Sequence, residues 1–236
     1  MNRLKLLLPI CAAIVAPCVT RAKAADIPPP QRYIPYVEVF GGFNTLPGIS
    51  GSDNSIFNII TPLGPGTVNS NVGEFGGIAV GVALNNHWRV EAELTRSYNS
   101  IQNFTFNNGN VNTYRSGAIN ETYALANVWY DFHNQSAFVP YVGGGLGLGW
   151  VNGNLETNFS GFNISATAPA ALAFQVGAGV VYDVSDRFSI DLGYRFKAMT
   201  GLDPTVTSQP FVPGSYTIDQ TSVASHNFQI GAVLHF

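Results

Sequence analysis

The sequence predicts an all-β fold, an eight-stranded antiparallel transmembrane β-barrel in which each strand pairs with the next in an up-and-down meander. Three observations predict it. Eight segments alternate apolar and polar residues, and the connections between them alternate long and short. Charged residues make up only 11% of the chain, whereas a soluble domain has about a quarter. Alternation with a period of two is typical of strands with one apolar face.

The first 24 residues predict a secretory signal peptide. A basic start with Arg3 and Lys5 precedes an apolar stretch from Leu6 to Val19, and the segment ends in the small-x-small pattern that signal peptidases cleave. We therefore expect residues 1–24 to be removed after Ala24. The run is short and contains two prolines, which disfavours the alternative of a membrane anchor.

Both cysteines of the chain, Cys11 and Cys18, lie inside the predicted signal. The mature chain would then carry neither a disulfide nor a reactive thiol. Residues 25–35 include three consecutive prolines and predict an extended periplasmic lead-in, followed by the barrel over residues 36–236. The net charge of −3 gives no reason to expect a nucleic-acid partner.

The candidate strands are read from period-two alternation. The clearest sets Phe188, Ile190 and Leu192 against Ser189 and Asp191. The eight predicted strands are Tyr36–Asn44, Gly73–Leu84, Trp88–Tyr98, Asn120–Tyr130, Phe138–Asn152, Ala171–Asp183, Arg187–Met199 and Val223–Phe236.

The lengths of the connections predict how the strands are joined. Long connections over residues 45–72, 99–119, 153–170 and 200–222 alternate with short ones over 85–87, 131–137 and 184–186. A meander gives this alternation when all short turns lie at one end of the barrel. Short periplasmic turns, longer outer loops and an even number of strands are the layout of outer-membrane barrels of Gram-negative bacteria.

The physics of the bilayer requires such a sheet to close, because lipid offers no hydrogen-bond partner to an unpaired strand edge. Apolar residues should then face lipid, with aromatic side chains near both membrane interfaces. Polar residues should face the interior, which in a barrel of eight strands is just wide enough for side chains to fill. We expect the interior to be a polar plug formed by Glu38, Arg89, Glu91, Glu93, Asp191, Arg195, Lys197 and Gln229.

A run of glycines at Gly143, Gly145, Gly147 and Gly149 leaves one inner wall bare. Either large side chains from facing strands fill this wall or it borders a narrow wet passage, and the size of the barrel favours filling.

Catalytic and ligand-binding patterns are weak. The four histidines share no metal-ligand spacing, and the glycine-rich segment GGGLGLGW matches no nucleotide-binding loop. Ser225 and His226 are the only adjacent nucleophile and base, but neighbouring residues of a strand point to opposite faces. We therefore predict no catalytic residues, no metal and no cofactor.

The last strand ends in alternating apolar residues and a terminal aromatic: Phe228, Ile230, Leu234 and Phe236. Together with ALANVWYDF, PYVGGGLGLGW and LGYRF, it resembles the opacity-type surface antigens and the alphaproteobacterial major outer-membrane (porin-family) proteins. The resemblance covers nearly the whole mature chain. It implies a barrel in the cell outer membrane whose last strand is the signal recognised by the barrel-assembly machinery.

The predicted function is structural: a barrel that contributes to envelope integrity and surface exposure, with adhesion or host interaction as a further role. The alternatives are a narrow porin-like channel for small solutes and an outer-membrane lipid-modifying enzyme. The expected partners are outer-membrane lipids and lipopolysaccharide, the assembly machinery, and host or phage ligands at the long loops, which are rich in Asn, Ser, Thr and Gly.

The terminal residue gives a first testable prediction. Deleting Phe236, or replacing it with Asp, should lower the amount of assembled barrel far more than His235→Ala, because Phe236 is in phase with the lipid face. Whole-cell proteolysis of exposed loops measures the assembled fraction. Equal surface levels of the wild type and the deletion variant would contradict the prediction.

Overall fold

The computed structural model describes residues 33–47, 49–51, 66–84, 87–106, 111–113, 116–156, 163–202, 205–209, 214–217 and 221–236. The chain divides into two compact units, Met1–Gln31 and Arg32–Phe236, and all described residues belong to the second. The predicted signal peptide and the first part of the lead-in lie outside the described residues. Among the residues described, no helix has the length and apolarity needed to cross a membrane.

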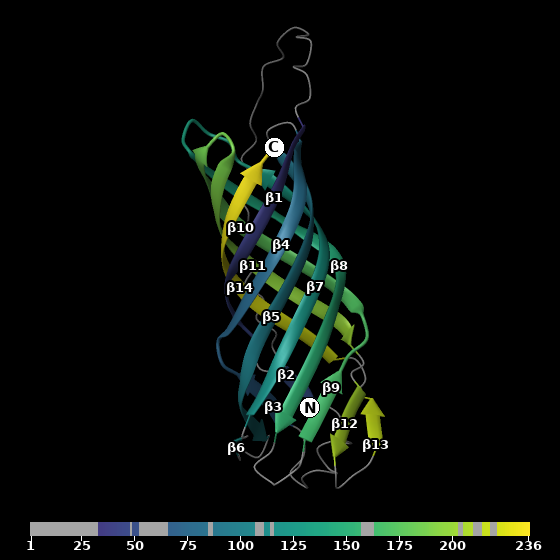
Figure 1. Cartoon of the computed structure of the whole chain (residues 1–236). Coiled ribbons are helices and arrows are strands. Elements are labelled where there is room, and N and C mark those ends of the chain that lie inside the picture. Colours follow the sequence, from purple (N-terminus) through teal and green to yellow (C-terminus); the bar gives the residue numbers. More distant parts are fainter. Residues whose placement is uncertain are drawn as a thin grey trace, which may run out of the picture. The chain divides into compact units, whose positions relative to one another are not determined.

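Eight long strands form a closed antiparallel ring (Figure 1). The last strand pairs with the first over ten residues, from Tyr36 opposite His235 to Thr45 opposite His226. The predicted fold is therefore confirmed. In ring order the strands are β1 (Tyr33–Thr45), β4 (Gly73–Leu84), β5 (Trp88–Phe106), β7 (Ser116–Asp131), β8 (Phe138–Glu156), β10 (Ala171–Ser185), β11 (Phe188–Leu202) and β14 (Thr221–His235).

In the described parts of the four long connections, where the sequence predicted loops, there are six short strands. Some of them extend the ring beyond its long-loop end, since β3 pairs with β5 and β9 pairs with β8. Their sequences, such as GTVNS and NISAT, show little contrast between the two faces, so alternation did not mark them. The six are β2 (Ile49–Gly51), β3 (Gly66–Ser70), β6 (Val111–Thr113), β9 (Asn163–Thr167), β12 (Thr205–Gln209) and β13 (Gly214–Thr217).

Several predicted strand ends were wrong. At the long-loop end β5 continues to Phe106 instead of Tyr98, and β8 continues to Glu156, because backbone pairing goes on where the hydrophobic alternation stops. At the other end Arg187 lies in a turn before β11. The terminal Phe236 lies one residue beyond β14, although its backbone N–H donates a hydrogen bond to the Pro35 carbonyl at 3.0 Å.

The two faces of the ring differ sharply. On β11 the side chain of Leu192 is 56% exposed and that of Asp191 only 1%, and on β5 the neighbours Leu94 and Glu93 show 50% and 6%. Outward residues are largely aliphatic or aromatic, as lipid requires. Other exposed members of the apolar band are Val39, Ile78, Val80, Val128, Val142, Leu146, Leu172, Val176 and Ile230.

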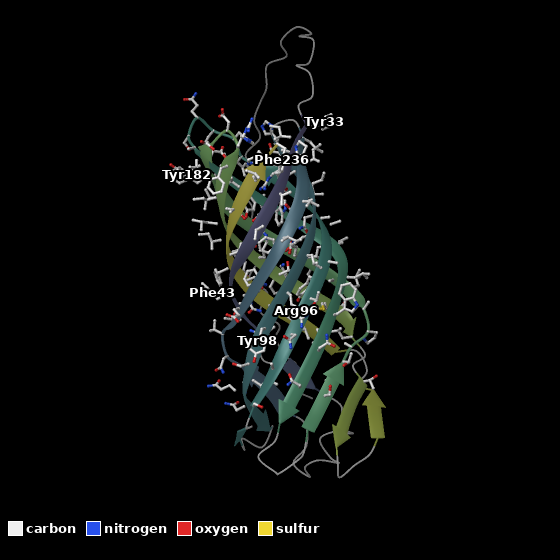
Figure 2. The ribbon with its side chains drawn as sticks, in the orientation of Figure 1. Tyr33, Phe43, Arg96, Tyr98, Tyr182 and Phe236 are labelled. Carbon is white, nitrogen blue, oxygen red and sulfur yellow. The ribbon has the colours of Figure 1, made fainter. Side chains whose placement is uncertain are left out.

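Aromatic side chains lie at two levels of the outer face. Tyr33, Tyr182 and Phe236 lie near the short-turn end, and Phe43 and Tyr98 lie further toward the long loops (Figure 2). These levels agree with the interfacial positions that aromatic residues prefer in membrane barrels. Of the other aromatic residues near the strand ends, Trp88, Phe132, Phe138 and Phe188 are exposed, while Tyr130, Trp150 and Phe174 are half-buried.

The face assignment yields a prediction about folding in lipid. Leu192→Arg should lower the free energy of unfolding by roughly 2–4 kcal/mol, because it places a cation in the apolar band. Asp191→Asn on the inner face should cost less, since an amide keeps most of its hydrogen bonds. Denaturant titrations in lipid vesicles measure both values, and the reverse ranking would contradict the assigned faces.

Candidate functional site

The barrel interior is the candidate functional site, because it gathers most of the buried polar side chains of the described residues. The structure places all eight residues predicted for the plug in this interior, and each is buried. They come from β1, β5, β11 and β14. The eight are Glu38, Arg89, Glu91, Glu93, Asp191, Arg195, Lys197 and Gln229.

An ion pair between Lys197 and Glu93 spans the lumen. The two residues lie on β11 and β5, which are separated by β4, β1 and β14 on one side of the ring and by β7, β8 and β10 on the other. Lys197 also donates a hydrogen bond to the Thr95 hydroxyl at 2.9 Å, and Gln175 donates to the second oxygen of Glu93 at 2.7 Å. Opposite walls are therefore joined directly.

Two arginines fill the half of the interior nearer the short turns. Arg89 pairs with Asp131 at 2.9 Å, and its guanidinium lies 4.9 Å from the centre of the Tyr141 ring. Arg195 lies 5.0 Å from the centre of the same ring and 3.6 Å from the Asp191 carboxylate. Arg195 also lies 4.1 Å from the centre of the Trp129 ring, a cation–π contact that again crosses the interior.

Acidic side chains outnumber basic ones among the described buried residues, and neutral donors make up the difference. Glu91 accepts hydrogen bonds from the Tyr36 hydroxyl at 2.6 Å and from the Trp129 indole N–H at 2.8 Å. Glu121 accepts from Ser97 and Tyr123, each at 3.1 Å. The carboxylates are Glu38, Glu91, Glu93, Glu121, Asp131 and Asp191, and the cations are Arg89, Arg195 and Lys197.

Sequence reasoning missed several interior residues on β7. Glu121, Asn127 and Trp129 all belong to the inward phase of this strand, and Asp131, predicted to lie in a turn, continues the same phase as its last residue. In the segment NETYALANVWYD (120–131), the inward residues occupy the odd-numbered positions and could have been recognised by their polar side chains. Apolar inward residues such as Leu125 weaken the contrast between the two faces of the strand.

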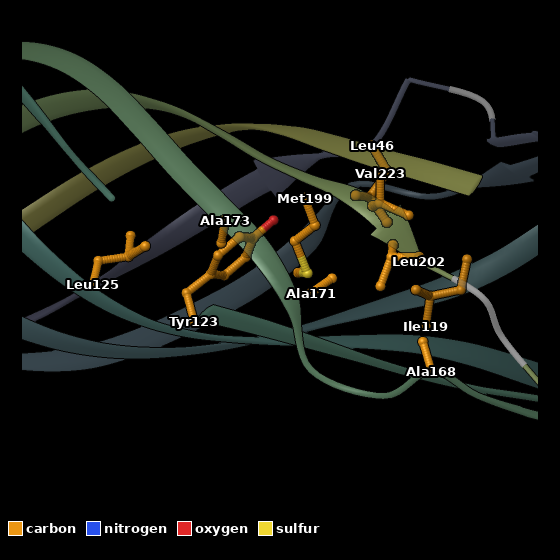
Figure 3. Packing of buried hydrophobic residues seen from close by; sticks show 10 residues of the cluster. All are labelled: Leu46, Ile119, Tyr123, Leu125, Ala168, Ala171, Ala173, Met199, Leu202 and Val223. Atoms are coloured by element: carbon orange, nitrogen blue, oxygen red, sulfur yellow. The ribbon is translucent and has the colours of Figure 1, made fainter. Parts of the chain in front are cut away.

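The expectation of a polar interior was wrong toward the long loops. There the described core is an apolar cluster that includes Tyr123, Met199, Leu202 and Val223 (Figure 3). Met199 and Leu202 are three positions apart, so alternation alone would place them on opposite faces. A register shift in β11 between them, with Gly201 at a positive φ of 72°, turns Leu202 inward as well.

The glycines of β8 leave room for large neighbours rather than for a passage. A Cβ atom added at Gly143 would lie 2.6 Å from Cε3 of Trp129, and one added at Gly149 would lie 2.7 Å from Cγ of Met199. At Gly145 the Asn127 side chain occupies the corresponding space. Side chains therefore fill the space beside these glycines, which is the alternative that the sequence favoured. Two of them, Trp129 and Asn127, come from the neighbouring strand β7 and the third, Met199, from β11.

The predicted separation of Ser225 and His226 is observed. Ser225 is fully buried in the interior, whereas His226 lies on the outer face with its ring nitrogen 2.7 Å from the Tyr194 hydroxyl. The two side chains therefore form no catalytic pair. The described residues include no group of three or more His, Cys, Asp or Glu side chains arranged to hold a metal ion.

The residues predicted as the assembly signal lie on the outer face of β14 and just beyond it. Phe228, Ile230 and Leu234 are 44%, 58% and 46% exposed, and Phe236 is 72% exposed. They add an apolar stripe to the edge at which the ring closes.

Sequence comparison gives a family match over most of the chain. The profile of the outer membrane protein beta-barrel domain matches residues 12–236. Outer membrane protein PagN of Salmonella typhimurium is 31% identical over 117 residues, which are 48% of each protein. An uncharacterised protein of Brucella abortus is 30% identical over 90 residues, 33% of this chain and 30% of that protein. The chain thus matches half or less of the length of these curated relatives.

Solved structures agree in fold. The outer membrane protein OprG from Pseudomonas aeruginosa superposes with a TM-score of 0.55 at 15% identity, covering 85% of this chain and 95% of OprG. A major outer membrane protein from Thermus thermophilus gives 0.55 at 11% identity, covering 86% and 99%. The outer membrane protease OmpT from Escherichia coli gives 0.52 at 8% identity, covering 86% and 97%. At these identities the likeness extends to the barrel alone.

The glycine wall gives a prediction with a control on the same strand. Gly143→Ala should destabilise the barrel by about 1–3 kcal/mol, because the added methyl group overlaps Trp129 and the β7 backbone. Gly153→Ala is the matched control, since its Cβ would meet nothing closer than 3.8 Å. Unfolding in detergent, followed by tryptophan fluorescence, compares them. Equal loss of stability in the two variants would contradict the role assigned to Gly143.

Proposed function

This chain belongs to the outer membrane protein beta-barrel domain family and lies in the outer membrane of a Gram-negative bacterium. We propose that it serves there as a structural barrel with a closed interior. In this role it contributes to envelope integrity and presents loops at the surface. The observation that carries the proposal is the contact between Lys197 and Glu93, which joins opposite walls of the ring.

The contacts around this ion pair make the closure continuous. Toward the short turns, Gln229 donates to Asp191 at 2.9 Å, and the Tyr141 hydroxyl donates to the same carboxylate oxygen at 3.0 Å. Toward the long loops, the apolar cluster around Met199 follows directly. A solute crossing the barrel would have to displace both layers, so the closed state is favoured over a resting channel.

The buried charges also oppose spontaneous opening. Separating a buried ion pair leaves each charge without its partner in a poorly hydrated space, and removal of one partner of such a pair costs about 3–5 kcal/mol. Lys197 and Glu93 are 1% and 6% exposed. An opening that separates them would therefore be rare unless another group replaces the lost contact.

A narrow channel is the second candidate, and one observation favours it. Four buried polar atoms of the interior have no hydrogen-bond partner among the described residues: Nη2 of Arg89, Oε1 of Gln175, Oδ1 of Asp191 and Nη1 of Arg195. Buried polar groups of this kind usually bind water. A hydrated path along them would connect the two sides of the plug only if the contact between Lys197 and Glu93 opened.

The proposal includes three kinds of partner: lipids, the assembly machinery and external ligands. Outer-membrane lipids and lipopolysaccharide would contact the apolar band, and the exposed cation Arg96 lies beside Tyr98 at the level nearer the long loops (Figure 2). The barrel-assembly machinery would bind the terminal strand. Host or phage ligands would meet the long loops, much of which lies outside the described residues.

The two candidates predict different conductance. The unmodified protein in planar bilayers should show no stable open state or only small, rare openings, because the plug occupies the lumen. Glu93→Ala combined with Arg195→Ala should raise the conductance, since it shortens two side chains that cross the interior.

The control for this experiment is Arg96→Ala, which removes an outward-facing cation and should leave the conductance unchanged. Circular dichroism and heat-modifiable mobility on gels establish that each variant is folded. Large, steady openings of the unmodified protein would overturn the closed barrel in favour of the channel.

A further inference from the structure

Two histidines from different turns meet at the short-turn end of the barrel. His87 lies in the turn between β4 and β5, and His133 lies in the turn between β7 and β8. Their ring centres are 5.7 Å apart, with an angle of 62° between the ring planes. Both side chains are exposed. Forty-six sequence positions separate them, so only the pairing of β5 with β7 brings them together.

The backbone around the two histidines is fixed by pairing. Trp88 lies opposite Tyr130 in the β5–β7 ladder, and the backbone N–H of Asp131 donates to the His87 carbonyl at 2.6 Å. The Tyr130 ring packs against both His87, at 5.7 Å between centres, and Trp88, at 4.9 Å. The paired backbone therefore holds the two turns, and with them the two imidazoles, beside each other.

The separation of the rings suits a bridging metal ion. A metal about 2.1 Å from one nitrogen of each imidazole holds the ring centres roughly 5–6 Å apart at ordinary coordination angles. Imidazole is the commonest protein ligand of transition metals, and it suits Cu²⁺, Ni²⁺ and Zn²⁺. Hard cations such as Ca²⁺ and Mg²⁺ require oxygen ligands instead.

We propose that His87 and His133 together bind one divalent transition-metal ion at the periplasmic end of the barrel. Water completes the coordination sphere, so the site is open and exchangeable. Affinity should follow the order Cu²⁺ above Ni²⁺ and Zn²⁺. The bound ion would join the β4–β5 turn to the β7–β8 turn. The proposal does not depend on whether the lumen conducts.

The test uses the protein purified from outer membranes without an affinity tag, titrated with Cu²⁺ in detergent. Cu²⁺ quenches nearby indole fluorescence, and Trp88 packs against the Tyr130 ring that contacts His87. We expect saturable quenching with one Cu²⁺ per chain. Trp88→Phe should remove most of this quenching without changing the stoichiometry measured by electron paramagnetic resonance, which also counts the nitrogen ligands.

Variants identify the ligands. His87→Ala and His133→Ala should each weaken Cu²⁺ binding roughly 10- to 100-fold or more, since loss of even an outer-shell partner costs that much. The matched control is His235→Ala, at the same end of the barrel, where the imidazole instead contacts Ser189 at 3.1 Å. The His235→Ala variant should bind Cu²⁺ like the wild type. The electron paramagnetic resonance spectra of His87→Ala and His133→Ala should each show one nitrogen ligand fewer than the wild type.

Two results would overturn the proposal. The first is wild-type affinity in both His87→Ala and His133→Ala, which would show that the rings only pack against each other. The second is a wild-type protein that fails to bind Cu²⁺ at millimolar concentration. A large excess of Zn²⁺ added to the Cu²⁺ complex should restore the fluorescence by competition, because Zn²⁺ binds the same imidazoles more weakly. This independent readout supports the site only if His133→Ala abolishes it.

Discussion

The requirement that every backbone polar group in lipid has a partner is the constraint on which the rest of this structure depends. It is met by the pairing of β14 with β1, which turns a meander into a closed ring. Closure makes the two faces unequal, one against lipid and one against a narrow interior. The outward Leu192 and the inward Asp191 therefore have opposite environments although they are neighbours in sequence.

The small interior then determines which side chains interact. In a ring of eight strands, long side chains from opposite walls reach one another. Lys197 and Glu93 meet in this way, and Arg195 reaches the Trp129 ring. Glycines on β8 provide the space for these groups, since Gly143 lies against Trp129. The charges of the interior thus act as packing groups whose cost of burial is offset by ion pairs and neutral donors.

The sequence predicted correctly which residues face the interior where apolar and polar residues alternate strictly along a strand, and it missed inward residues where they do not. Glu91 and Arg195 could be placed because aliphatic and aromatic residues flank them. Glu121 and Asp131 were missed, since inward residues of β7 are partly apolar and its last residue was taken for a turn. Leu202 of the apolar layer around Met199 was also missed, because it faces inward only after a register shift at Gly201 that reverses the phase of β11.

The sequence by itself determined the number of long strands, the face of most residues and the alternation of short and long connections. These are properties of one strand and its turns, and a local period of two records them. Only the tertiary structure decided which charges pair across the lumen, how far strands continue beyond the apolar band, and that His87 lies beside His133. Such contacts join distant strands, and their positions depend on the stagger of the closed ring, which no single segment encodes.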